Sequence, residues 1–118
     1  MISLIQNNNY DAEINYIDEN DQPVNLSGYY FNFIVKEKKD CLNNDVKALI
    51  DKTILLNGVE AENGIFYLNL LPADTKDLKP TDEQTQYIYQ MQISKTTVVN
   101  TFEQGDFVVK ANKKKGTI

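Results

Sequence analysis

The sequence predicts an all-β fold: an immunoglobulin-like antiparallel β-sandwich of seven to eight strands, with one short helical turn near residues 72–78. Three observations lead to this prediction. Apolar and polar residues alternate with a period of two along most of the chain, as in half-buried strands. The alternating segments are short, and Asn, Asp, Gly and Pro residues separate them. The length of 118 residues suits one domain, which we place at residues 1–110.

The N-terminal half of the chain is expected to contain four strands, at residues 2–5, 10–17, 29–36 and 48–55. The second of these is the clearest, because Tyr, Ala, Ile and Tyr alternate with acidic and amide residues. Residues 18–23, Asp-Glu-Asn-Asp-Gln-Pro, follow it as a turn. Within the fourth strand, residues 50–54 mix the two faces, as a β-bulge would.

The C-terminal half contains further alternating segments at residues 65–70, 87–93, 98–102 and 106–110. The last two form a strand pair, or one strand that a bulge interrupts at Gly105. Asn57-Gly58 and Asn63-Gly64 favour positive φ in the connection before residue 65. Pro72 suits the first position of a helical turn, and Leu78 can anchor that turn to the core.

The inward positions of these strands predict one hydrophobic core. Its members are Ile14, Tyr16, Phe31, Phe33, Val35, Phe66, Leu68, Leu70, Tyr89, Met91, Ile93, Phe107 and Val109.

The composition argues against several classes of function. The chain has no His, Trp or Arg, all 12 basic residues are Lys, and the net charge is −5. Without His, the Ser-His-Asp and Cys-His catalytic arrangements and the commonest zinc ligand are missing. We therefore expect no enzyme activity, no cofactor and no metal site. An acidic chain without Arg is a poor nucleic-acid binder. The mean hydropathy of −0.45 predicts no membrane span.

Three polar segments allow a functional and a structural interpretation. Residues 18–21 could supply oxygen ligands to calcium, but they lack the EF-hand order, so we interpret them as a hairpin turn. Cys41, the single cysteine, lies in a polar run without a general base and is interpreted as incidental. Residues 111–118 form a basic C-terminal tail. Its Lys113–Lys115 cluster could contact nucleic acid or an acidic surface, but we interpret it as solvated.

Four apolar residues fall on the outward faces of their predicted strands: Tyr30, Ile34, Tyr67 and Ile88. The outer face of an antiparallel sheet is usually polar, so an apolar cluster there would mark an interface. These four residues are the candidate interface, and the alternative is that they scatter or that the chain covers them.

Five segments occur in a characteristic order: residues 18–28 (DENDQPVNLSG), 30–37 (YFNFIVKE), 64–75 (GIFYLNLLPADT), 87–93 (YIYQMQI) and 105–110 (GDFVVK). This succession resembles the N-terminal domain of phage baseplate upper proteins and related immunoglobulin-like virion domains. The resemblance covers nearly the whole chain. It implies a non-enzymatic structural domain without catalytic residues, whose partners are copies of itself and neighbouring virion proteins.

The first functional hypothesis is therefore a phage or prophage structural protein of the tail, baseplate or neck, located in the virion and assembled in the bacterial host cytoplasm. The alternative is a stand-alone immunoglobulin-like module that binds a host protein or a carbohydrate. The lack of Trp weighs against a carbohydrate platform. A third hypothesis is a phage-encoded regulator that sequesters a host protein.

Overall fold

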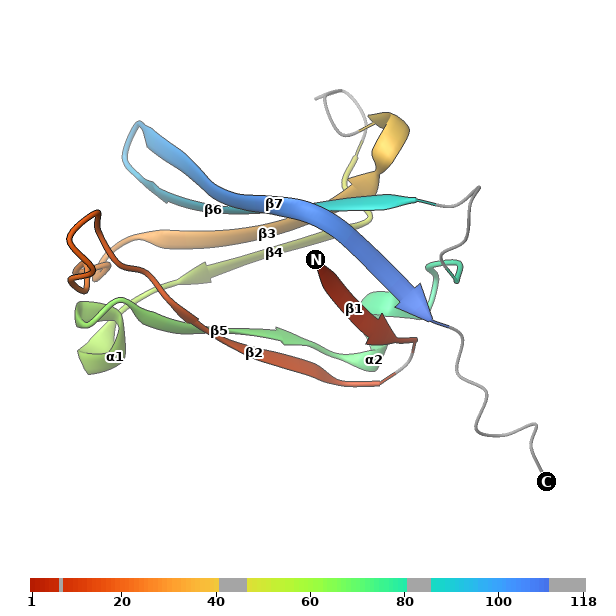
Figure 1. The fold of residues 1–118 in the computed structure, drawn as a ribbon, viewed down its shortest axis with the longest axis horizontal. Helices are drawn as coiled ribbons and strands as arrows, with labels where there is room; N and C mark the ends of the chain where they lie inside the picture. Colours follow the sequence, from red (N-terminus) through yellow and green to blue (C-terminus); the bar gives the residue numbers. More distant parts are fainter. Residues whose placement is uncertain (7, 41–46, 81–85, 111–118) are drawn as a thin grey trace.

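The computed structural model describes residues 1–6, 8–40, 47–80 and 86–110, and in it seven strands form two facing sheets (Figure 1). The strands are β1 (Ile2–Ile5), β2 (Tyr10–Asn15), β3 (Tyr30–Glu37), β4 (Ile50–Leu55), β5 (Ile65–Leu70), β6 (Tyr87–Lys95) and β7 (Val98–Lys110). The larger sheet has the order β1-β7-β6-β3-β4, and the smaller sheet pairs β2 with β5. The predicted all-β sandwich is confirmed. An immunoglobulin domain is divided in the same way, with strands C, F and G in one sheet and strands B and E in the other. Here β3, β6 and β7 take the places of C, F and G, and β2 and β5 take those of B and E.

One strand pair departs from the predicted antiparallel arrangement. β1 runs parallel to β7, with Ile2 opposite Phe107 and Ile5 opposite Lys110. Parallel neighbours need a long connection between them. Here the two strands lie at opposite ends of the chain, so the rest of the domain is that connection.

The described part of the chain also contains three short helical segments: η1 (Lys38–Asp40), α1 (Gly58–Glu62) and α2 (Pro72–Thr75). The helical turn expected near residues 72–78 is confirmed by α2, which begins at Pro72, and Leu78 is buried after it. The sequence did not predict η1 or α1. In α1, the Asn-Gly pairs that suggested turns flank one helical turn, with positive φ at Gly58 and Gly64.

The expected bulges lie elsewhere. β4 pairs regularly with β3 over all six residues, so residues 50–54 contain no bulge. β7 is one strand of 13 residues, and its irregularity lies opposite Met91/Gln92 at Phe102 rather than at Gly105. Gly105 has a different role. A Cβ there would lie 3.3 Å from the Tyr89 ring, so glycine lets that ring pack against β7.

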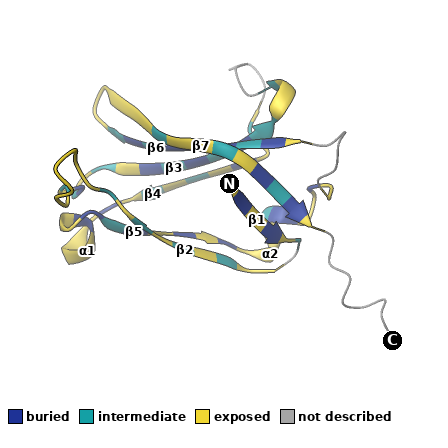
Figure 2. Cartoon of the chain, in the orientation of Figure 1, coloured by how far each residue is buried: buried dark blue, intermediate teal, exposed yellow. Residues whose placement is uncertain are grey.

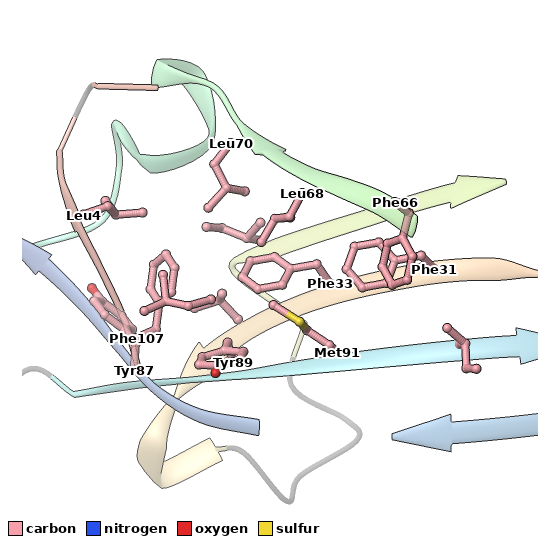
Figure 3. Close-up of a cluster of buried hydrophobic side chains, with 14 of the residues drawn as sticks. Leu4, Phe31, Phe33, Phe66, Leu68, Leu70, Tyr87, Tyr89, Met91 and Phe107 are labelled. Carbon is pink, nitrogen blue, oxygen red and sulfur yellow. The ribbon is translucent and has the colours of Figure 1, made fainter. Parts of the chain in front are cut away.

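The hydrophobic core fills the space between the sheets (Figures 2 and 3). Eleven of the thirteen predicted core residues are buried, whereas Ile14 and Tyr16 are half-buried. Both lie on the β2 side of the smaller sheet, where two strands cover only part of the larger sheet. The rings of Phe31 and Phe66 meet across the layers with centroids 4.7 Å apart. Strands β1 and β3 to β7 thus bury side chains in one core, and the predicted tail at 111–118 lies outside the described residues.

Candidate protein–protein interfaces

The four predicted interface residues lie on opposite faces of the sandwich. Tyr30 and Ile34 of β3 and Ile88 of β6 lie on the outer face of the larger sheet, whereas Tyr67 lies on the outer face of the smaller sheet. They do not form a single patch. Period-two alternation assigns a residue to one face of its own strand, but it does not say which sheet the strand joins.

Two of these residues are largely covered by their neighbours. Ile34 is opposite Gln90 in the β3–β6 pair, and Ile88 is opposite Lys36. The four side chains line one small depression, and both isoleucines are half-buried. Long polar side chains cover apolar surface in this way. Tyr30 is more available, with 47% of its surface exposed.

The outer face of the larger sheet is nearly uncharged over three transverse rows of side chains. From β4 through β3 and β6 to β7, the strand registers give the rows Leu55-Tyr30-Ser94-Val99, Thr53-Asn32-Gln92-Thr101 and Asp51-Ile34-Gln90-Gln104. Only one of these twelve positions, Asp51, carries a charge. Depletion of charge is typical of the core of a protein–protein interface.

Cross-strand hydrogen bonds order the polar rows of this face. The side-chain nitrogen Nδ2 of Asn32 donates to Asp51 Oδ1 at 2.8 Å and to Thr53 Oγ1 at 3.0 Å. Gln92 Nε2 donates to Thr101 Oγ1 at 3.1 Å. Side chains held in one arrangement lose less conformational entropy when a partner binds. A shallow hollow of about 460 Å³ lies over these rows, beside the exposed side chains of Tyr30, Leu55 and Val99.

The outer face of the smaller sheet has the opposite character, because it is acidic. Asp11 and Glu13 project from β2, and Glu60 and Glu62 lie on α1, which follows β4 and precedes β5. Neither β2, β5 nor α1 contains Lys. The Tyr67 hydroxyl donates to Glu60 Oε2 at 2.6 Å. This hydrogen bond, with the nearby carboxylate charge, raises the pKa of Tyr67 above its ordinary value.

The segment α1 connects β4 of the larger sheet to β5 of the smaller sheet (Figure 1). Residues at the end of β4, from α1 and from β5 line an open groove there. Its volume is about 260 Å³. Its apolar walls come from the ends of both sheets, including Ile54 and Leu56 from one and Ile65 and Phe66 from the other. Sequence reasoning did not identify this groove. The available signal was that residues 65–70, Ile-Phe-Tyr-Leu-Asn-Leu, contain no charge and no Pro.

The acidic segment after β2 is a turn in the structure. Asp18 Oδ1 accepts hydrogen bonds from the backbone N–H groups of Asn20 and Gln22, at 2.8 and 3.0 Å, and Asp21 has a φ of 61°. This is the conformational use of Asp and Asn that the turn interpretation predicts. Among the described residues, no three His, Cys, Asp or Glu side chains are grouped to hold a metal ion. Cys41 lies outside the described residues.

No protein-family model matches the chain, and no curated protein is significantly similar to it. In the part of the chain that the structure describes, no helix is long and apolar enough to cross a membrane.

Proposed function

We propose that this chain is a non-enzymatic structural protein of a phage or prophage, a tail, baseplate or neck module that assembles through protein–protein contacts. Its partners in this proposal are copies of itself and other virion proteins. It is located in the virion, which is assembled in the bacterial host cytoplasm. The proposal joins the succession of strand motifs in the sequence to one structural observation, the nearly uncharged outer face of the larger sheet.

That face supports self-assembly for an electrostatic reason. Each copy carries a net charge of −5, so two copies repel each other at most orientations. The rows around Asn32 and Gln92 can meet a second copy with little charge repulsion. Amide and hydroxyl side chains both donate and accept hydrogen bonds, so such a face can be complementary to itself.

The solution mass of the purified protein tests the proposal. Light scattering on a sizing column, over a range of concentrations, is expected to show a closed oligomer such as a trimer, hexamer or dodecamer. Gln92→Lys places a charge in the central row and is expected to shift the mass towards the monomer. Asn15→Lys, the same kind of change on the exposed face of β2, is the matched control and is expected to leave the mass unchanged.

A second measurement tests the virion assignment directly. Mass spectrometry of purified phage particles from the host that encodes the chain is expected to find it at a fixed copy number. A strict 13.5 kDa monomer that is missing from the particles would overturn the proposal. That result would favour the alternative, a stand-alone binding module for a host protein or a carbohydrate.

A further inference from the structure

We infer that the free edge of β5 is a docking site for an extended, basic segment of a partner protein, which adds as a third strand to the smaller sheet. The inference does not rest on the proposed function, because it concerns the opposite sheet and a different kind of contact. Three features of the described residues carry it: an unpaired strand edge, an apolar groove beside that edge, and a one-sided charge around it.

The unpaired edge follows from the strand register. Among the described residues, β5 pairs only with β2, over all six of its residues. One step before the strand, Tyr16 N donates to Gly64 O at 2.7 Å. Opposed residues in an antiparallel pair alternate between hydrogen-bonded and non-hydrogen-bonded positions. The N–H and C=O groups of Ile65, Tyr67 and Asn69 therefore point away from β2, towards the free edge.

The residues of this edge strand carry none of the features that keep other edges from pairing. Proteins protect edge strands with charged residues, Pro, bulges or short length, or cover them with a helix or loop. The short helix α1 contacts β5 but leaves the groove beside it open. β4, the edge strand across the groove, carries Asp51 and Lys52. β1, the other edge of the larger sheet, has only four residues. β5 has six regularly paired residues, no charge and no Pro.

The groove beside the edge supplies a place for inward side chains. An added strand would alternate its side chains between the groove and the outer face of the sheet. The groove is lined by half-buried Ile54 and Ile65 over the buried side chains of Leu56 and Phe66, and its open volume of about 260 Å³ has room for an apolar side chain of moderate size. Strand addition of this kind draws affinity from main-chain hydrogen bonds and specificity from alternate side-chain contacts.

The charge around the edge selects the chemistry of the occupant. The outward side chains of an added strand would lie beside Tyr67, whose hydroxyl group binds the Glu60 carboxylate. The Glu13 carboxylate lies one strand further away, opposite Tyr67 on β2, within reach of a long basic side chain. A second copy joined through its own β5 would bring the same carboxylates together, and like charges would repel. A segment whose outward residues are Lys or Arg meets these acids with the opposite charge. The partner segment therefore alternates apolar and basic residues.

Synthetic peptides test this inference on the full chain. The probe is a blocked peptide of alternating Lys and Val, long enough to span the six residues of β5, and the matched control alternates Glu and Val. NMR titration of ¹⁵N-labelled protein is expected to show shifts and slowed amide exchange at Ile65, Tyr67 and Asn69. The Lys peptide is expected to bind at least about tenfold more tightly than the Glu peptide, and more weakly as salt rises.

Two further comparisons separate strand pairing from general charge attraction. N-methylation of alternate peptide amides removes hydrogen-bond donors and keeps the charge. It is expected to abolish binding when the methylated amides are those that face β5, and to preserve binding when they are those that face away. Glu13→Gln is expected to weaken the binding of the Lys peptide, whereas Asp106→Asn on the larger sheet is expected to leave its affinity unchanged. Equal binding of the Lys and Glu peptides, no binding, or shifts confined to the larger sheet would overturn the inference. The oligomer measurement does not bear on these results.

Discussion

Replacement of Gly64 by Ala should destabilise this fold far more than the same change at Gly58. Both glycines have positive φ, +74° and +89°, where a Cβ is unfavourable. That conformational cost is roughly 1–2 kcal/mol at each site. The surroundings differ, because a Cβ on Gly58 meets nothing within 4 Å. A Cβ on Gly64 would lie 2.4 Å from the backbone oxygen of Tyr16 and 3.1 Å from that of Val24.

The extra cost at Gly64 arises from that close contact. The strand ends must separate to admit the methyl group, and overpacking of this kind costs about 1–3 kcal/mol. The separation also weakens the hydrogen bond from Tyr16 N to Gly64 O, which is worth about 0.5–1.5 kcal/mol. Gly64→Ala should therefore lower the free energy of unfolding by about 2–4 kcal/mol more than Gly58→Ala.

Urea unfolding of the two variants and the parent measures this difference. The slope should stay constant while the midpoints separate, since the change acts on the native state. Gly58→Ala is the matched control, because it has the same chemistry and the same sign of φ. If the two variants unfold within about 0.5 kcal/mol of each other, the close approach of Tyr16 to Gly64 does not constrain the start of β5, and the reasoning is wrong.

Two further predictions concern polar groups near the core. The Asp74 carboxylate accepts the Leu71 N–H at 2.7 Å and pairs with Lys52 at 2.9 Å. Asp74→Ala should therefore lower the free energy of urea unfolding by about 1–2 kcal/mol, and an equal loss in Lys52→Met would contradict the capping role. Burial and a hydrogen bond to Glu103 raise the pKa of Tyr89. Its contribution to stability should be complete below about pH 10 and lost as pH rises through the folded pKa. Urea unfolding at a series of alkaline pH values should show that Tyr89→Phe loses less free energy of unfolding than the parent protein as pH rises. An equal loss in the two proteins would refute this role of Tyr89.

Much of the fold could be predicted because strand positions and inward faces depend on the pattern of residues that are close together in the sequence. A period of two identifies the buried side of residues such as Phe33 and Leu68 whatever the strand pairs with. The turn at Asp18 and the helical turn at Pro72 follow from side-chain and ring geometry within a few residues. These features need no knowledge of the rest of the chain.

The features that required the tertiary structure depend on which strands become neighbours. Tyr30 and Tyr67 have the same outward signature in the sequence, yet they lie on different sheets. Gly105 suggested a bulge, but its small size serves the ring of Tyr89 on the adjacent strand.

The sequence by itself determined most of the strand positions, the helical turn at Pro72 and most of the core. Only the tertiary structure decided where the uncharged face lies and that one edge of β5 has no strand partner among the described residues. The physical reason is that alternation is a property of one strand, whereas a face or an edge exists only after hydrogen bonds have chosen each strand's neighbours.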